Sequence, residues 1–106
     1  MIYQLYSVYD EVLQVFNLPF ASINHRDAMR SLTSAALDPE SRLAQHPKDY
    51  SLYFVATYDD SNGSYSNIQP PSLLVRVPIL IIQHQQNDLN ELKSEFTNQH
   101  GENNNV

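Results

Sequence analysis

Alternating apolar and polar positions predict a β-hairpin in the middle of the chain. The set of alternate side chains expected to face a covering helix is Leu52, Phe54, Ala56 and Tyr58. The other set is Tyr53, Val55 and Thr57. Asn62-Gly63 follows, a dipeptide that tolerates the positive φ angles of a tight hairpin turn. We therefore expect a strand over residues 51–59, a turn, and a returning strand over 64–68.

The N-terminal residues 2–10 also alternate and predict a strand. Ile2, Tyr6 and Val8 form one side, and Tyr3, Leu5 and Tyr9 form the other. If this strand lies beside the central one, Tyr3, Tyr9 and Tyr53 share one face of the sheet. That face has two interpretations, because aromatic residues favour strands anyway. It is either ordinary strand packing or a surface for binding or dimerisation.

The pattern predicts one main helix after residue 24. Asn24 is a good N-cap. The stripe expected to face the core is Ala28, Met29, Leu32 and Ala36. Asp38-Pro39 ends this helix. The preceding segment, residues 11–20, fits a helical turn as well as a short strand, and both alternatives remain open.

The C-terminal third combines an apolar run with a second helix. Residues 73–82 predict a further strand that Pro78 confines to a sheet edge or a bulge. Asp88 and Glu91 form a capping box that predicts a last helix. Exposed apolar side chains would promote aggregation, so we expect the chain's own core or a second subunit to cover them. The expected protein interface comprises Leu73, Val75, Ile79, Ile81, Leu89, Leu92 and Phe96.

Together these elements predict an α+β fold. We expect a small antiparallel sheet of three to four strands, one main helix packed on one face, and a C-terminal helix. A chain of 106 residues has room for one core. The expected organisation is a single domain over residues 1–86, an amphipathic helix over 87–99 and a disordered tail over 100–106.

Charge and composition narrow the function classes. Six basic residues against twelve acidic ones give a net charge of −6, the wrong sign for a protein that coats phosphate by electrostatics alone. A nucleic-acid role would need a local basic patch, base stacking or a partner. The chain has no cysteine, no stretch of membrane-spanning length and no signal-peptide pattern, so we expect a soluble protein of a reducing cytoplasm.

Signatures of catalysis and cofactor binding are missing. Two glycines cannot build a phosphate-binding loop, and the four histidines are scattered without metal-ligand spacing. Asp59 and Asp60 are neighbours on a strand and would point to opposite sides, so they are expected to shape the turn. We expect no enzyme, no metal and no cofactor. Arg26 and Arg30, one helical turn apart, either bracket a phosphate or simply solvate a helix face.

A series of short motifs runs in order from Tyr6 to Pro71. The motifs are Ser7-Val8-Tyr9-Asp10, Pro19-Phe20, Arg30, Asp38-Pro39, His46-Pro47, Asp49-Tyr50, Leu52-Tyr53, Tyr58-Asp59-Asp60, Gly63 and Pro70-Pro71. In their order and spacing, the chain resembles the small nonstructural protein of gokushoviruses, the single-stranded DNA phages of the Microviridae that include the chlamydia phages. The resemblance implies a non-capsid, DNA-binding phage protein made in the cytoplasm of the infected bacterium. It also implies a role in turning replication towards the synthesis and packaging of single strands.

Two hypotheses follow. In the first, the protein binds single-stranded DNA or replication factors, with bases stacked on Tyr3, Tyr9 and Tyr53. The residues expected to meet the DNA backbone are Arg26, Arg30 and Lys48. In the second, it is a self-associating assembly or scaffolding protein that acts through phage proteins without contacting DNA. In both, we expect a homo-oligomer.

Overall fold

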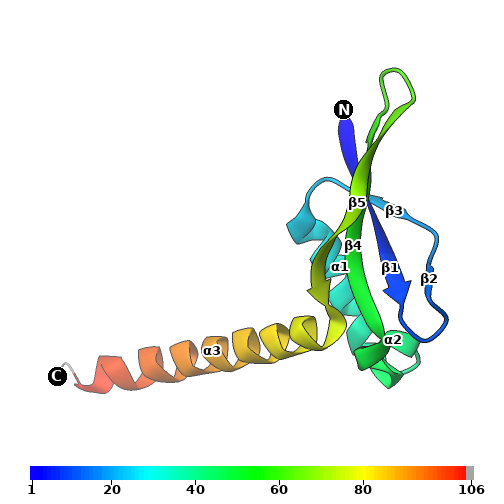
Figure 1. Ribbon diagram of the computed structural model, residues 1–106. Coiled ribbons are helices and arrows are strands. Elements are labelled where there is room, and N and C mark those ends of the chain that lie inside the picture. Colours follow the sequence, from blue (N-terminus) through cyan, green and yellow to red (C-terminus); the bar gives the residue numbers. More distant parts are fainter. Residues whose placement is uncertain (105–106) are drawn as a thin grey trace.

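The computed structural model describes the backbone of residues 1–104 and the side chains of residues 1–97. Strands and helices follow in the order β1 (Ile2–Asp10), β2 (Val15–Phe16), β3 (Phe20–Ser22), α1 (His25–Leu37), α2 (Arg42–Gln45), the 3-10 turn η1 (Pro47–Asp49), β4 (Tyr50–Asp59), β5 (Ser64–Arg76) and α3 (Val77–Asn104). Figure 1 shows a curled sheet with helices packed beside it and α3 projecting away.

The sheet is antiparallel and is built around β1 and β4. Its order is β2-β1-β4-β5, and β3 also pairs with β1. Both β2 and β3 are very short and lie along the same side of β1. The predicted α+β class, with a small antiparallel sheet, a helix on it and a C-terminal helix, is confirmed. The sheet has five strands because two short segments between β1 and α1 join it.

The core lies between α1 and one face of the sheet. Asn24 caps α1 as predicted: its Oδ1 accepts a hydrogen bond from the Asp27 backbone N–H at 2.8 Å. The core comprises Tyr6, Val8, Ala28, Leu32, Ala36, Tyr50, Leu52, Val77 and Leu80. The Tyr6 hydroxyl lies 2.7 Å from both Gln4 Oε1 and His25 Nδ1, so this buried polar group has partners. Burial also raises the pKa of Tyr6.

A bulge in β4 corrects the predicted assignment of faces. Tyr6 pairs with Phe54, whereas Leu5 pairs with Ala56, so Val55 is an extra residue on β4. Adjacent residues of β1 point to opposite faces, and cross-strand partners share a face. Ala56 therefore lies on the face opposite Phe54, as does Tyr58, so the alternation of β4 is reversed beyond the bulge. The four residues predicted to face the helix are therefore divided between the two faces: Leu52 and Phe54 lie on one, and Ala56 and Tyr58 on the other. Strict alternation does not allow for an inserted residue.

The start of α3 also corrects the sequence analysis. The strand predicted over residues 73–82 ends at Arg76, and the helix predicted from Asp88 already begins at Val77. The physical reason is Pro78: its fixed φ and missing N–H suit the first turn of a helix better than a strand. Val77 and Leu80, three residues apart, are both buried in the core and anchor this turn. Of the predicted disordered tail over 100–106, the backbone to Asn104 belongs to α3, and residues 105–106 lie outside the described residues.

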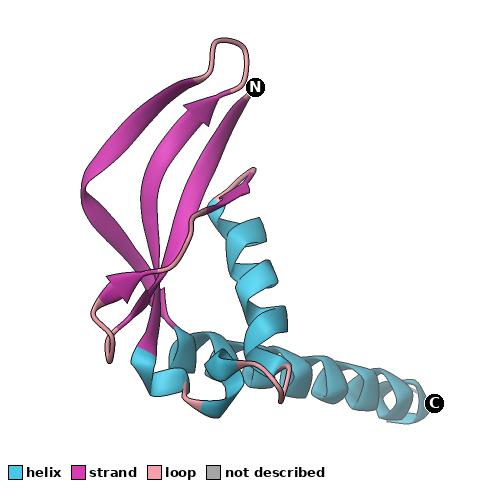
Figure 2. Cartoon of the chain, turned by 90° about the vertical axis from the view of Figure 1, so that its right-hand side faces the viewer, coloured by secondary structure: helices cyan, strands magenta, loops and turns pink. Residues whose placement is uncertain are grey.

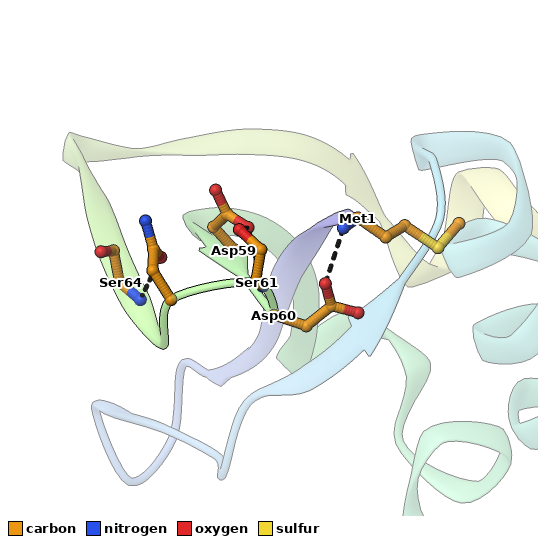
Figure 3. Close-up of polar contacts among 6 residues, drawn as sticks. Met1, Asp59, Asp60, Ser61 and Ser64 are labelled. Atoms are coloured by element: carbon orange, nitrogen blue, oxygen red, sulfur yellow. Dashed lines mark hydrogen bonds and ion pairs between the residues drawn. The ribbon is translucent and has the colours of Figure 1, made fainter.

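Of the two carboxylates predicted to shape the β4–β5 turn, that of Asp59 does so, whereas that of Asp60 pairs with the amino group of Met1 (Figure 3). Asp59 Oδ1 accepts hydrogen bonds from the Ser61 backbone N–H at 3.0 Å and from the Ser61 hydroxyl at 2.6 Å. Asp60 Oδ1 lies 2.6 Å from the amino group of Met1. Gly63 has a φ of 73°, which favours glycine. The two carboxylates therefore serve separate structural partners at the hairpin tip.

A pair of leucine truncations tests the position of the core. Leu52 is completely buried and Leu18 is 91% exposed. We expect Leu52→Ala to lower the free energy of unfolding by about 2–5 kcal/mol, because it removes buried methyl groups and leaves a cavity. The matched change Leu18→Ala is expected to stay within about 0.5 kcal/mol of wild type. Urea denaturation measures both, and equal effects would contradict the assignment of the core.

Hydrogen bonds at the hairpin tip are expected to lower the pKa of one carboxylate, that of Asp59. The hydrogen bond from the Ser61 side chain, followed by that from its backbone N–H, lowers the pKa of Asp59. Because the pKa is lower in the folded state, ionised Asp59 stabilises the fold. This stabilisation is present above the unfolded pKa of Asp59 and is lost as the pH falls through the folded pKa. Ser61→Ala should therefore raise the pKa of Asp59 towards its ordinary value in an NMR titration. Ser64→Ala, in the same turn, is the control and should leave that pKa unchanged.

Candidate nucleic-acid interface

Three aromatic rings gather on the face of the sheet opposite α1. Tyr9 of β1, Phe16 of β2 and Tyr53 of β4 form this aromatic cluster. The ring centroids of Tyr9 and Phe16 lie 4.7 Å apart, those of Phe16 and Tyr53 lie 5.2 Å apart, and those of Tyr9 and Tyr53 lie 6.0 Å apart. Two of these three contacts are edge-on, an arrangement that aromatic rings favour.

Strand alternation fixes the direction of the cluster. Val8 and Leu52 are cross-strand partners and both point into the core. Their neighbours Tyr9 and Tyr53 must therefore point to the other face. Figure 2 shows α1 on one side of the sheet and, within the described part of the chain, no helix on the opposite side. The sequence analysis correctly placed Tyr9 and Tyr53 together on the face away from the main helix.

A tight turn after β1 brings Phe16 into the cluster. Asp10 Oδ1 accepts hydrogen bonds from the backbone N–H groups of Val12 and Leu13 at 2.9 and 3.1 Å. The Ser7 hydroxyl donates to the Asn17 carbonyl at 2.6 Å, which fastens the returning segment to β1. Of the two alternatives left open for residues 11–20, a helical turn or a short strand, the structure has the short strand β2. Sequence reasoning missed Phe16 because its position depended on that choice.

The cluster is open to solvent. Phe16 is 46% exposed, and Tyr9 and Tyr53 are half-buried and contact each other and Phe16. Leu73 of β5, the cross-strand partner of Tyr53, is also exposed. The rings thus form a partly apolar platform on the sheet.

Tyr3 belongs to a second aromatic group at the other end of β1. Tyr3 pairs with Tyr58, and Tyr58 pairs with Tyr65 of β5. The ring centroids of Tyr58 and Tyr65 lie 4.9 Å apart, and Tyr65 is largely exposed. Because β1 alternates without interruption, Tyr3 and Tyr9 lie on the same face. Aromatic side chains therefore occupy both ends of this face.

A cation that the sequence analysis overlooked lies beside the aromatic cluster. Arg76 pairs with Ser51, which pairs with Tyr9, so these three residues form one row on the open face. The Arg76 side chain is 60% exposed, and its Nη1 lies 3.4 Å from Oε1 of Glu11. The signal in the sequence was a single arginine inside the apolar run over residues 73–82.

The predicted cations are distributed differently from the tyrosines. Arg26 and Arg30 lie on α1 and line a cleft between α1 and α3, so they are not brought together with the aromatic cluster. Lys48 is exposed in η1. The backbone carbonyl of its neighbour Asp49 accepts a hydrogen bond from the Glu11 backbone N–H at 2.8 Å, so Lys48 lies at the same end of the sheet as the cluster.

The predicted interface residues also divide into two groups. Val75 and Ile81 are half-buried against the core. The exposed members are Leu73, Ile79, Leu89, Leu92 and Phe96. Most of these exposed side chains lie on α3. The expected interface is therefore not a single surface.

Other chemistry is sparse in the described residues. The His25 ring is hydrogen-bonded to the Tyr6 hydroxyl, and His84 Nε2 lies 3.2 Å from Asp88 Oδ2 on the next turn of α3. Over the part of the chain with described side chains, no group of histidine and acidic residues could hold a metal ion. None of the described helices combines the length and the apolar character needed to cross a membrane.

Residues 3–78 match the model of a protein family described as Phage ORF5 protein. The chain belongs to this phage protein family. The part that matches the Phage ORF5 family contains the whole aromatic cluster, Arg76 and α1, and it ends as α3 begins. No curated protein and no solved structure matches the chain.

Proposed function

We propose that this protein is a non-capsid accessory protein of a gokushovirus, one of the Microviridae, that binds single-stranded DNA. It would act in the cytoplasm of the infected bacterium, directly or with replication factors, to favour single-strand synthesis and genome packaging. Membership of a phage protein family and the motif resemblance from Tyr6 to Pro71 support the phage setting. The observation that carries the proposal is the open aromatic cluster beside Arg76.

Base stacking is the main interaction in the proposed mechanism. A partly exposed ring on a sheet offers a π-face to any base, and each stacked base contributes about 1–3 kcal/mol. Tyr53 and Phe16 are held by contacts with each other and with Tyr9, so little side-chain freedom remains to be lost on binding. The second aromatic group, Tyr3, Tyr58 and Tyr65, would extend the path of the strand along the same face.

Arg76 supplies the phosphate contact. Its ion pair with Glu11 is long and solvent-exposed, and such pairs contribute about 0–1 kcal/mol. A phosphate group can therefore displace Glu11, since a guanidinium binds two phosphate oxygens in a fork. Lys48, at the same end of the sheet, would provide a second contact. This role involves binding without catalysis.

A chain with only six basic residues and a net charge of −6 can make few phosphate contacts, so the salt dependence of binding should be shallow. For single strands, the slope of log K against log salt is about −0.7 for each phosphate contact. With one or two contacts, the slope should lie between about −0.7 and −1.4. Stacking would then provide most of the affinity.

Substitutions at Tyr53 test the stacking surface. Tyr53→Ala should weaken binding of a fluorescently labelled oligothymidine by about 5- to 150-fold in an anisotropy titration. Tyr53→Phe keeps the ring and is the matched control, with an affinity close to wild type. Circular dichroism checks that both variants are folded. Equal affinities for the two variants, or no binding by wild type at low salt, would contradict the proposal.

Two arginine substitutions test which face meets the DNA. Arg76→Ala should weaken binding and reduce the salt slope by about 0.7, because one phosphate contact is lost. Arg30→Ala removes an exposed arginine from the α1–α3 cleft and should leave binding unchanged. The same anisotropy titration across a salt series measures both. A larger effect of Arg30→Ala would place the DNA on the helix side of the molecule instead.

A second candidate function is supported by the shape of the chain. In a self-associating assembly or scaffolding protein, apolar side chains left exposed in the monomer would be buried between subunits. Leu89 and Leu92 on α3 are such side chains. This candidate would take precedence if no DNA bound at low salt.

A further inference from the structure

Much of α3 extends beyond the body of the molecule. The helix has 28 residues, and its first turns pack on the core through Val77, Leu80 and Ile81. Figure 1 shows the rest projecting away from the sheet. The radius of gyration is 18.2 Å, compared with about 13 Å for a compact domain of this length. A long helix in water gains most of its stability from packing, so the projecting part calls for a partner.

The projecting helix carries an apolar seam with a heptad period. Ile82 and Leu89 lie seven residues apart, and Leu92 follows three residues after Leu89. Phe96 repeats the seven-residue step from Leu89. In a heptad written abcdefg, these four residues occupy the positions a, a, d and a, which form the contact seam of a coiled coil. Their side chains are exposed, from 47% for Ile82 to 63% for Leu92.

The seam lies on a different side of α3 from the body of the molecule and from the cleft. Successive residues of an α-helix are turned by about 100°. Ile82 and Leu89 therefore point nearly opposite to Leu80, which lines the cleft between α1 and α3. The middle of the seam lies roughly a third of a turn from the side of α3 that packs on the core. The body thus leaves the seam accessible, and a helix that covers the seam does not enter the cleft.

Charged residues beside the seam match a copy of the same helix. In this heptad, Asp88 occupies a g position and Lys93 an e position. When two helices run parallel and in register, each g residue faces the e residue that lies five places further along the partner, and such pairs set partner choice and orientation. Asp88 and Lys93 are five places apart, so each Asp88 would meet the partner's Lys93. The helix is therefore complementary to itself in the parallel arrangement.

An antiparallel pair would lack this match. In that arrangement g residues face g residues, and e residues face e residues. The g residues Asp88 and Glu95 are both acidic, so they would face acidic residues of the partner. Lys93 would face Gln86 or another lysine. Because like charges opposed across an interface reduce affinity, the charge pattern favours parallel helices.

Asp88 and Lys93 are both available for this contact. Asp88 Oδ2 lies 3.2 Å from His84 Nε2 of its own helix, and the Asp88 side chain is still 60% exposed. Such an exposed pair contributes little stability and can be given up. Lys93 is exposed and has no ion-pair partner in the part of the chain with described side chains.

Gln85 adds a polar group to the seam. It occupies the d position between Ile82 and Leu89 and is exposed. In a parallel pair in register, its amide lies against the same amide of the partner, and the two can hydrogen-bond to each other. A polar residue in a seam fixes the register at a cost in stability. Gln85 therefore favours a copy in register over a purely apolar surface.

We propose that α3 pairs with α3 of a second copy as a parallel coiled coil, with Ile82, Leu89 and Leu92 in its seam. The twofold axis runs along the helices, and each Asp88 meets the partner's Lys93. An isoleucine at a and a leucine at d favour two strands. Both sheets then lie at the same end of the pair. The inference rests on the second candidate function, self-association, and does not depend on DNA binding.

Charges placed on two sides of α3 test the seam in the full chain. Sedimentation equilibrium over a concentration series should show a dimer for wild type. Leu92→Asp buries a charge in the seam and should weaken dimerisation at least about tenfold. Asn90→Asp adds the same charge at an exposed position outside the seam and the cleft, and it should dimerise as wild type does. Circular dichroism checks that both variants are folded.

Charge reversal tests the self-complementary contact. Asp88→Lys and Lys93→Glu each place like charges at both contacts, so each variant alone should dimerise about tenfold more weakly. An equimolar mixture of the two should recover the dimer, because each contact then joins opposite charges. Glu91→Lys, on the cleft side of the same helix, is the matched control and should keep wild-type affinity.

Introduced cysteines test the orientation, because the chain has none of its own. Gln85→Cys and Leu92→Cys are made as separate variants. Each should form a disulfide-linked dimer under mild oxidation, because d positions of parallel helices lie opposite their own copies. An antiparallel pair can bring at most one of these two positions to its own copy.

Four results would each overturn the proposal: a monomeric wild type, equal dimerisation of the Leu92→Asp and Asn90→Asp variants, a mixture as weak as its components, or crosslinking at fewer than both cysteines. A wild-type dimer that survives Leu92→Asp would leave self-association standing through another surface. The Tyr53 and Arg76 titrations report on the open face of the sheet. Failure of the α3 pair, of self-association and of DNA binding are therefore distinguishable.

Discussion

The packing of one face of β1 and β4 against α1 is the constraint on which the rest of the structure depends. Tyr6 and Leu52 are completely buried there, and α1 places Ala28, Leu32 and Ala36 against them. Once these side chains point inwards, the residues between them must point outwards. The open aromatic face is thus a direct consequence of the core. The same packing sets the position of α1, and hence of one wall of the cleft.

Much of this fold could be predicted from local patterns. The alternation in residues 2–10 and 51–59, the Asn24 cap and the Asn62-Gly63 turn each rest on interactions within a few residues, and all are present in the structure. The bulge at Val55 and the start of α3 at Val77 were not predictable in this way. The bulge depends on how β4 meets its neighbours, and Pro78 suits both an edge strand and a first helical turn.

In the candidate site, too, features set by local sequence could be predicted, and features set by tertiary contacts could not. Tyr9 and Tyr53 were placed together because strand alternation decides their face. Arg26 and Arg30 were correctly expected to be exposed. The spacing of apolar residues along a helix does not reveal on which side of the sheet its exposed residues lie. Arg76 joins Tyr9 only through the register of three strands. The sequence holds no direct sign of that register.

The outer strand β5 has a consequence for how copies of this protein can meet. β5 forms one edge of the sheet, and it carries Pro70-Pro71, which have no N–H to donate. Four residues of β5, 68–71, face the single residue Val55, so the edge is also irregular. Another strand cannot add smoothly to such an edge, and open-ended fibres built by sheet extension are disfavoured.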